Sequence, residues 1–576
     1  MDRRVTEPPP RRVLIIGGAG VFGERLTTGI LNTTPWHVIV AGRDAARLTA
    51  LRARLPEERV TAQRLDARRV TAADLRATGA CVVVDAAGPF QHGDHRLARA
   101  AIEAGMHYID LADARDFVAG FGVLEEAARA AGVVALTGAS STPALSNAAL
   151  DALTAGWRRV DRVEIAISPG NRAPRGLSVV RAILSQAGQP ARVLIGGEWV
   201  TRPGWGMTIR RALPGLGWRV LSLVETPDLD IMPARFRVRD TVVFRAGMEL
   251  AFLHWGLWAA SLLVRIGLLR SLTPLARPFR ALAVLVERFG SDRGGMLVEA
   301  TGLDVDGHPA RATWSLVAEA GDGPFVPTLP ALAALRALAA GTLAPPGAHA
   351  RAGLLPLAAI EAEFVPYRIT SARHAAPAPP ALYERVLGRA FASLPEAVRR
   401  AHQPGWGARF SGEAQVEGAE GILARMGAAV FRLPSAARRV PVSVEIVAEA
   451  GQERWVRRFG PGRFFSVLSA SSVPGRVVER FGPFRFELDL LVGTRGVVGM
   501  PMRAWRLGPV PLPLALAPVS IATEHVDAKG RFCFDVEMRL PLGLGRLVRY
   551  RGWLVEAGAS IPPGSLPDGP SLATLA

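Results

Sequence analysis

Lysine is almost absent from this sequence of 576 residues: Lys529 is the only one, so the remainder of its 69 lysines and arginines are arginine. A phosphate-binding loop of the Walker type is therefore excluded, because it needs a lysine directly after its glycines. The tyrosine–lysine pair of short-chain dehydrogenases is also excluded, since none of the four tyrosines has a lysine four residues later. A Schiff base would have to use Lys529 itself.

Cysteine is nearly as scarce, with only Cys81 and Cys533, far apart in the chain. Neither a CxxC pair nor an HExxH motif is present, so the sequence offers no familiar zinc spacing, and we expect no metal site. Two distant cysteines also cannot form a disulfide framework. A reducing cytoplasm is the location we expect, with the inner face of the membrane as an extension of it.

Long blocks of like charge are missing too, although the formal net charge is +18. The arginines are dispersed among aspartate and glutamate, which argues against nucleic-acid binding. A basic surface that faces an anionic cofactor or anionic lipid fits this pattern better. With 49% apolar residues, the chain can form about three folded domains.

A glycine-rich turn follows the first apolar run, residues 13–16. Gly18, Gly20 and Gly23 form GxGxxG, in which the glycines permit a tight turn, approach of backbone to a pyrophosphate and close helix packing. The helix that begins near Val21 and Phe22 would present free N–H groups to the phosphates.

Apolar strands and helical segments then alternate regularly, which predicts a parallel sheet built from right-handed crossovers. We expect a Rossmann domain over residues 1–150. The strands that we expect after the first lie at residues 37–41, up to 66, 81–85, 107–111 and 133–136.

Arg43 stands where NAD-binding domains carry an acidic residue for the ribose 2′-hydroxyl. A guanidinium instead suits a 2′-phosphate, so Arg43 predicts NADP as the cofactor. The alternative is that Arg43 is simply a solvated side chain. Asp66, at the end of the third strand, is expected to contact the adenine or to cap a helix.

The run Ala87-Gly88-Pro89-Phe90 after Asp85, together with the glycine turn, Arg43 and residues 108–111, resembles the saccharopine-dehydrogenase-like (saccharopine reductase-like) family of NADP-binding oxidoreductases. A weaker similarity continues through residues 290–296 to about 365. The resemblance implies that Gly88, Pro89 and Phe90 lie beside the nicotinamide ribose. The chain departs from the lysine-pathway enzymes of that family, in which a lysine contributes to catalysis, so saccharopine is not the expected substrate.

From about residue 381 the chain resembles a bacterial domain of unknown function that is often fused behind such an oxidoreductase. This resemblance implies no chemistry. The matching pieces are residues 382–383, 387–388, 394–395, 402, 453–455, 457–459, 534–536 and 550–553.

Candidate catalytic residues lie in loops after the strands, where open parallel sheets bind ligands. His92 is the first candidate for a general acid, because a histidine can donate a proton at neutral pH. The alternative is that His92 only caps a helix or is solvated. A metal site formed by His92 and His95 is a weaker interpretation. Tyr108 and Asp110 are the further catalytic candidates, with Asp110 able to orient such a group.

Residues 151–370 read as an α+β domain for substrate binding or dimerisation. It contains an apolar helix near residues 246–270, of which 250–264 carry no formal charge. Fifteen helical residues span about 22 Å, short of a hydrocarbon core of roughly 30 Å. Three alternatives stay open: a helix buried in the core or in a homodimer interface, a helix on a membrane surface, and a spanning helix.

Proline- and alanine-rich residues 371–380 predict a linker. Residues 381–565 then alternate in the manner of strands, which predicts a mostly antiparallel-β domain. Residues 507–518 would line or cover its apolar interior. We expect side chains to fill that interior, with a hydrophobic ligand as the alternative.

The expected fold class is therefore α/β: a Rossmann parallel sheet, an α+β second domain and a mostly β third. The expected function is that of an NADP(H)-dependent oxidoreductase acting on a small, hydrophobic carbonyl or imine substrate. The alternative is a non-catalytic NADP sensor, or a lipid-binding protein associated with the membrane.

Overall fold

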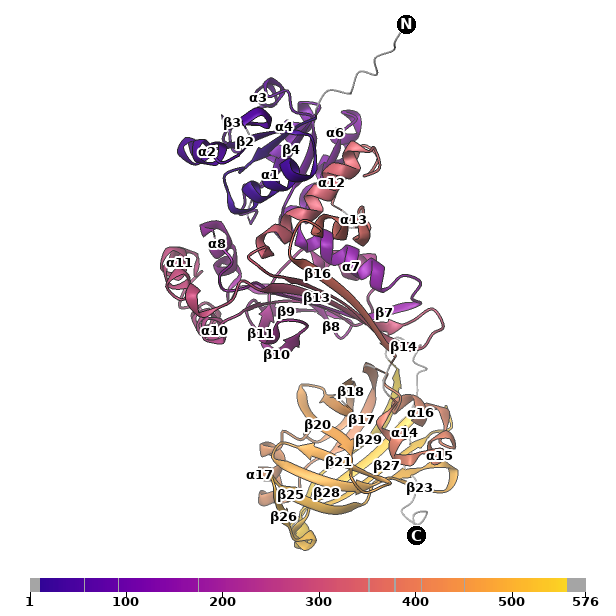
Figure 1. The fold of residues 1–576 in the computed structure, drawn as a ribbon. Helices are drawn as coiled ribbons and strands as arrows, with labels where there is room; N and C mark the ends of the chain where they lie inside the picture. The colour runs from indigo at the N-terminus through magenta and orange to yellow at the C-terminus, as the bar shows by residue number, and fades with distance from the viewer. Residues whose placement is uncertain are drawn as a thin grey trace. The chain divides into compact units, whose positions relative to one another are not determined.

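The computed structural model describes residues 11–55, 57–91, 93–174, 176–350, 353–377, 380–405, 407–449 and 451–556. The chain divides into two compact units. The first runs to Gly307 and continues over Arg311–Ala376, and the second takes His308–Ala310 and the chain from Pro377 onward (Figure 1).

The first unit opens with a parallel sheet of seven strands in the order β15-β6-β5-β4-β1-β2-β3. Apolar strands buried on both faces require helices on both sides, and the intervening segments supply them. The strands are β1 (Arg12–Ile16), β2 (His37–Gly42), β3 (Val60–Arg64), β4 (Val82–Asp85), β5 (His107–Asp110), β6 (Val134–Leu136) and β15 (Gly347–His349). The helices are α1 (Val21–Thr33), α2 (Ala45–Arg52), α3 (Ala72–Ala77), α4 (Arg96–Glu103), α5 (Arg115–Gly120) and α6 (Glu125–Ala130). The predicted Rossmann sheet is confirmed.

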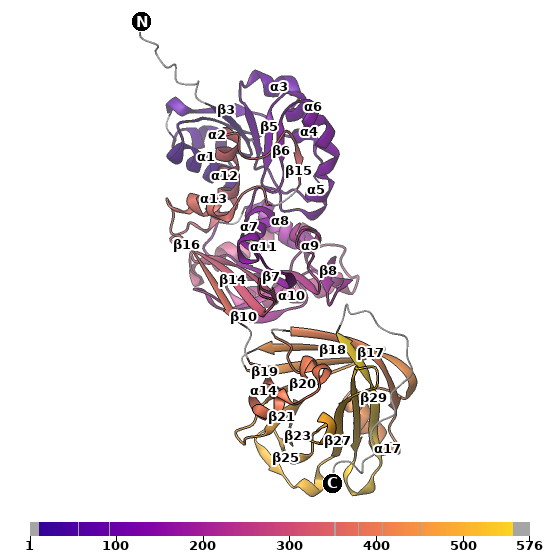
Figure 2. The same ribbon diagram turned by 90° about the vertical axis from the view of Figure 1, so that its right-hand side faces the viewer.

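The sheet extends beyond the boundary predicted at residue 150, because β15 comes from a distant part of the chain. β15 pairs in parallel with β6, Ala348 lying opposite Ala135. Glu125 of α6 fixes it by accepting a hydrogen bond from the Ala348 N–H at 2.7 Å. Figure 2 shows β15 beside β6 at the edge of the sheet.

A second, mixed sheet of nine strands completes the first unit, with the main order β10-β11-β12-β7-β13-β14-β16 and β8–β9 paired to β12. Its strands are β7 (Arg159–Ser168), β8 (Pro190–Ile195), β9 (Glu198–Pro203), β10 (Ile209–Leu213), β11 (Gly217–Leu223), β12 (Thr241–Met248), β13 (Gly294–Leu303), β14 (Pro309–Ala318) and β16 (Ile369–Pro377). Helices α7 (Ser146–Leu153), α9 (Asp228–Arg235), α12 (Leu329–Ala339) and α13 (Leu357–Glu361) belong to the same unit.

The predicted linker at 371–380 is wrong in part, because most of it forms β16. An alanine-rich segment can serve as an edge strand, where an exposed outer side and a terminal proline are tolerated. Only the last residues of the predicted linker lie beyond Pro377.

The predicted apolar helix is α10 (Ala251–Arg265), which packs with α8 (Leu177–Gln186) and α11 (Ala276–Leu285). Leu257 of α10 is buried in a cluster with Leu184 and Trp205. Phe252 and Trp255 on the opposite side are 57% and 46% exposed. Within the described part of the chain, no helix is long and apolar enough to cross a membrane.

The second unit is one antiparallel sheet of 13 strands in the order β23-β24-β27-β28-β29-β17-β18-β19-β20-β21-β22-β25-β26. Its longer strands are β17 (Gly407–Glu417), β18 (Ala437–Glu449), β19 (Gln452–Phe459), β20 (Gly462–Ala470), β21 (Arg476–Phe481), β22 (Phe484–Asp489), β25 (Met502–Leu507), β27 (Val519–Val526), β28 (Phe532–Arg539) and β29 (Arg546–Glu556). The short ones are β23 (Leu491–Val492), β24 (Val498–Gly499) and β26 (Val510–Leu512), and the helices are α14 (Leu382–Leu387), α15 (Arg389–Ala392), α16 (Glu396–Ala401) and α17 (Ile422–Val430). The predicted mostly antiparallel-β domain is confirmed.

The sheet of the second unit curls until its two ends meet. Met500 donates its N–H to the carbonyl of Ala522 in β27, while the carbonyl of the next residue, Pro501, accepts from the N–H of Asp489 in β22. A closed, curled sheet of this kind encloses an interior.

Candidate functional site

The glycine turn between β1 and α1 is held by backbone contacts that leave no room for side chains. Gly17, with φ +79°, and Gly18 both donate their N–H groups to the carbonyl of Ala41, at 2.8 and 3.0 Å. A Cβ on Gly23 would lie 2.2 Å from the carbonyl oxygen of Gly17. The third glycine is therefore required for α1 to pack against the turn, as the motif predicts.

Helix α1 begins directly after this turn, and no side chain caps it: Gly20 stands at the N-cap. Its first N–H groups are therefore available to an external acceptor. The positive end of the dipole of this 13-residue helix points the same way. Val21 and Phe22 form its first turn, as expected.

The loop after β4 lies directly against the glycine turn. A Cβ on Gly17 would lie 2.8 Å from both the carbonyl carbon of Ala86 and the Cα of Ala87. The run that was predicted to lie beside the nicotinamide ribose is thereby brought next to the predicted phosphate site. Ala87 and Pro89 are exposed, whereas Phe90 is buried, with its ring 5.3 Å from the ring of Phe117.

Arg43 lies just past the end of β2 and is exposed. Among the described residues its side chain has no hydrogen-bond or ion-pair partner. Its neighbour Asp44 is occupied, because it caps α2 by accepting from the N–H of Arg47 at 3.1 Å. Asp66 follows β3 and accepts from the N–H of Arg68 at 3.1 Å, which makes it a turn residue with one carboxylate oxygen uncommitted.

Two buried carboxyl groups support the loops at this edge. Asp85 ends β4 and accepts from the N–H of Ala87 at 2.9 Å, which fixes the start of the Gly88–Phe90 turn. Asp110 ends β5 and accepts from the N–H of Gly138 at 2.7 Å and from the hydroxyl of Thr137 at 2.9 Å. Both loops are thus tied to the strand ends by side-chain hydrogen bonds.

Burial changes the ionisation of this pair. It raises the pKa of Asp85 to about 6 and that of Asp110 to about 7, and hydrogen bonds from backbone N–H groups oppose the rise. Tyr108 lies on the same face of β5, 1% exposed, and interacts with both carboxyl groups. Burial and the neighbouring carboxylates raise the pKa of Tyr108 well above its usual value.

Of the predicted catalytic residues, His92 lies outside the described residues. Tyr108 and Asp110 are brought together, but both lie inside the domain: Asp110 is 0% exposed. His95 is a structural residue, since its Nε2 lies 2.8 Å from the carbonyl oxygen of Phe117 and its ring contacts that of Phe121.

The start of helix α8 also lies close to the glycine turn and α1. Gly176, the N-cap of α8, lies close to Val21: a Cβ on this glycine would be 3.5 Å from Val21 Cγ2. A buried carboxylate, Asp228 of α9, accepts hydrogen bonds from Ser146 Oγ at 2.7 Å and from Asn147 Nδ2 at 2.8 Å. Asp228 thus links α7 to α9, and an ion pair at 2.7 Å between Arg235 of α9 and Asp151 of α7 is a second link.

Sequence reasoning missed three of these supports. Gly17 and Asp85 stand at the ends of β1 and β4, next to motifs that were recognised in the sequence. Those positions were the signal by which they could have been found. Asp228 carries no such signal, because its partners lie about 80 residues away in the chain.

Comparison with known families identifies two segments. Residues 13–144 match the saccharopine dehydrogenase NADP binding domain, and residues 394–554 match a domain of unknown function, DUF4166. The N-terminal domain is therefore similar to the NADP-binding domain of saccharopine dehydrogenases, and both predicted resemblances are confirmed. No curated protein sequence matches the chain.

Solved structures with similar folds include dehydrogenases. The apo histidine-tagged saccharopine dehydrogenase (L-Glu forming) from Saccharomyces cerevisiae matches with 14% identity and a TM-score of 0.47, over 64% of this chain and 100% of that one. A probable dehydrogenase from Thermotoga maritima matches with 11% identity and a TM-score of 0.31, over 62% of this chain and 98% of that one.

Proposed function

We propose that this chain is an NADP(H)-dependent oxidoreductase that acts on a hydrophobic carbonyl or imine substrate. NADP(H), when bound, supplies or accepts the hydride. Two neighbouring features carry the proposal. The N-terminus of α1 has no side-chain cap and follows a glycine turn without room for side chains, and Arg43, at the end of the next strand, is exposed and has no partner among the described residues. A pyrophosphate fits the first element, and a 2′-phosphate fits the second.

The remaining cofactor contacts follow from the same edge of the sheet. Exposed Ala87 and Pro89 and half-buried Gly88 lie beside the glycine turn, where a nicotinamide ribose would lie, and Phe90 anchors the turn from inside. Asp66 would face the adenine end. We assign Tyr108 and Asp110 to positioning rather than to proton transfer, because both are buried, Asp110 holds the loop at Gly138, and Tyr108 interacts with Asp85 and Asp110.

The hydrophobic character of the substrate is supported by the helices beside the cofactor edge. The N-terminus of α8 lies at Val21, and α8 packs into the apolar cluster that it shares with α10 and α11. The start of α8 therefore brings an apolar cluster close to the glycine turn, and this nearness is what supports an apolar substrate.

The outer surface of the same helices fits an anionic membrane. Residues 250–290 contain five arginines and one acidic residue. Exposed apolar side chains accompany them, and those of α10 repeat on one helical face. We call this set of exposed apolar side chains between residues 250 and 290 the hairpin surface: Phe252, Trp255, Leu263, Ile266, Leu268, Leu275, Leu282, Val284, Leu285 and Phe289. Peripheral contact of the hairpin surface with anionic lipid is therefore part of the proposal.

Two measurements test the proposal. In calorimetric titration NADP(H) should bind at least about tenfold more tightly than NAD(H), because charge-assisted hydrogen bonds contribute about 1.5–3 kcal/mol. Equal affinity would contradict the cofactor assignment. NADPH consumption with hydrophobic ketones, aldehydes and imines, compared between the wild type and His92→Ala, then tests catalysis. Tight NADPH binding without turnover would support the non-catalytic sensor instead.

A further inference from the structure

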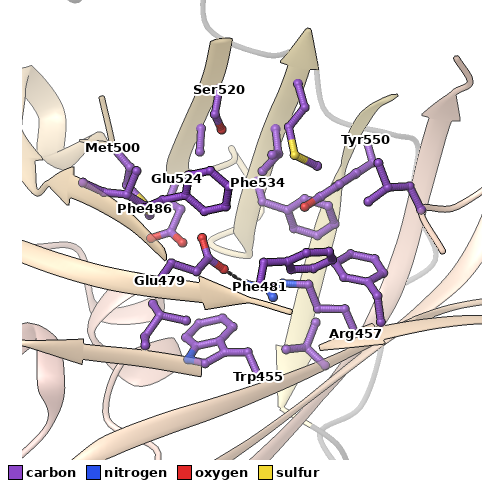
Figure 3. Close-up of a pocket in the computed structure, with 18 of the residues that line it drawn as sticks. Trp455, Arg457, Glu479, Phe481, Phe486, Met500, Ser520, Glu524, Phe534 and Tyr550 are labelled. Atoms are coloured by element: carbon purple, nitrogen blue, oxygen red, sulfur yellow. Dashed lines mark ion pairs between the residues drawn. The ribbon is translucent and has the colours of Figure 1, made fainter. Parts of the chain in front are cut away.

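The curled sheet of the second unit encloses a cavity of about 240 Å³. Its wall is mainly aromatic and aliphatic, with side chains from most of the strands (Figure 3). An engineered apolar cavity of about 150 Å³ stays dry and binds benzene, so this one has room for a larger molecule. The prediction that side chains fill the interior is therefore wrong: alternating strands specify an apolar interior but not how completely it is filled.

A few polar groups stand in this apolar wall. Arg457 lies 3.6 Å from the carboxylate of Glu479 and donates to Ser466 Oγ at 2.7 Å. Glu524 receives a 2.6 Å hydrogen bond from His402, which is fully buried behind it. Figure 3 shows the carboxylates of Glu479 and Glu524 on the same side of the cavity.

Two hydroxyl groups in the wall, those of Tyr550 and Ser520, have no hydrogen-bond partner among the described residues. One oxygen of Glu524 is likewise uncommitted, because His402 uses the other. A hydroxyl or carboxylate group that faces an apolar space without a partner is unfavourable. A ligand that completes its hydrogen bonds removes this cost, which makes the free energy of binding more favourable.

The charges of the wall indicate the kind of head group. Its lining carries two carboxylates and one guanidinium, and the guanidinium already pairs with Glu479. Even with a proton on His402 the lining has no surplus positive charge to receive an anion. A hydroxyl group, by contrast, can donate to the uncommitted oxygen of Glu524 without any further ion being desolvated.

One end of the unit is rimmed by exposed apolar side chains from α17 and two turns, beside strands whose residues line the cavity. Phe431, directly after α17, lines the cavity, as do Pro518 and Leu547 next to the turns. We call this set the apolar rim: Ile422, Leu423, Met426, Leu514, Leu516, Leu542 and Leu544. Apolar side chains around an opening are the surface across which an apolar ligand would enter.

We propose that the C-terminal unit binds one lipid-like molecule with an uncharged hydroxyl head group. The chain of this ligand would occupy the aromatic cavity, its hydroxyl would lie at Glu524, and it would enter across the apolar rim. The proposal does not depend on the oxidoreductase assignment, because every residue that it uses belongs to the second unit.

The full-length protein tests this with three probes of one chain length: 1-decanol, decanoic acid and decylamine. Binding is measured by isothermal titration and by the intrinsic tryptophan fluorescence of the protein, to which Trp455 and Trp505 in the cavity wall contribute. We expect 1-decanol to bind at least tenfold more tightly than decanoic acid. Tighter binding of the acid or the amine would overturn the head-group assignment, and absence of binding by all three would overturn the site.

Variants locate the binding. Ala522→Phe fills the cavity from β27 and should weaken 1-decanol binding at least tenfold, whereas Ala504→Phe, on a strand residue outside the lining, should not. Glu524→Gln should weaken the binding of 1-decanol and should also reduce the preference for 1-decanol over decanoic acid. NADP titration of each variant reports on the first unit independently. If Ala522→Phe fails to fold, Val536→Phe replaces it, and unchanged decanol binding in the folded variant would contradict the proposal.

Discussion

Asp85 and Asp110 lie directly opposite each other at the carboxyl ends of the neighbouring strands β4 and β5. Each carboxyl group holds one of the loops that surround the candidate cofactor site, Asp85 through Ala87 and Asp110 through Gly138. Two buried carboxyl groups this close together cannot both ionise freely. The ionisation of the groups that hold the two loops, and with it the stability of the site, therefore depends on pH.

The first prediction concerns that coupling. The folded state raises the pKa of Asp110 from 3.8 to about 7, so it binds this proton more tightly than the unfolded chain does. Stability should therefore fall as the pH rises from about 4 to about 7. Asp110→Asn cannot ionise and should flatten this part of the profile of melting temperature against pH. A variant with the wild-type slope would show that Asp110 does not carry the effect.

The second prediction concerns the glycine turn. Gly23→Ala places a Cβ against the backbone of Gly17 and Gly18, so NADP binding should be lost and stability should fall by about 1–3 kcal/mol. Gly122→Ala is the matched control, because nothing lies within 4 Å of its added carbon. Denaturant unfolding and NADP titration of both proteins check this, and equal effects would contradict it.

The third prediction separates the two cofactors. Arg43→Ala should weaken NADP binding about 10–100-fold and leave NAD binding nearly unchanged, because only NADP carries the 2′-phosphate. Arg99→Ala, an exposed arginine of α4, should change neither affinity. A parallel loss of NAD and NADP affinity in Arg43→Ala would place the side chain elsewhere on the cofactor.

The fourth prediction concerns the hairpin surface. Trp255→Glu removes an exposed aromatic side chain and adds a negative charge, so sedimentation with anionic vesicles should fall at least about tenfold. Trp199→Glu, at an exposed tryptophan of β9, is the control. No sedimentation of the wild-type protein, or equal loss in both variants, would remove the membrane contact from the proposed function.

The fifth prediction concerns the link between α7 and α9. Asp228→Ala leaves the buried donors of Ser146 and Asn147 without their acceptor and should cost about 3 kcal/mol of unfolding free energy. Asp228→Asn keeps one acceptor oxygen and should cost less. Chemical denaturation measures both; a larger loss in the asparagine variant would show that the charge, rather than the hydrogen bonds, stabilises this link.

Local patterns predicted the nucleotide-binding part well. The strand that starts at His37 was predicted correctly because a buried parallel strand reads as a short apolar run. The glycine turn was recognised because its spacing reflects sterics inside one short segment. The position of Arg43 follows from the same unit, since it lies directly after the second strand.

Features that depend on distant partners could not be predicted in this way. The three residues of β15 carry no periodicity, and they form a strand only because β6 offers a free edge. The alternation around Tyr108 and Asp110 shows that both side chains lie on one face of β5. It does not show that this face is buried. The cavity of the second unit depends on how side chains from many strands meet, and no single segment records that.

Strand β15 also has a consequence for how the protein is made. A ribosome releases β1 to β6 long before it reaches Gly347, so the nascent nucleotide-binding sheet waits with β6 as an open edge while roughly two hundred further residues are synthesised. An open edge is a site for mispairing with another chain. Helper proteins that shield nascent chains should therefore engage this one during that interval, and an N-terminal fragment that stops at residue 150 should aggregate where the whole chain does not.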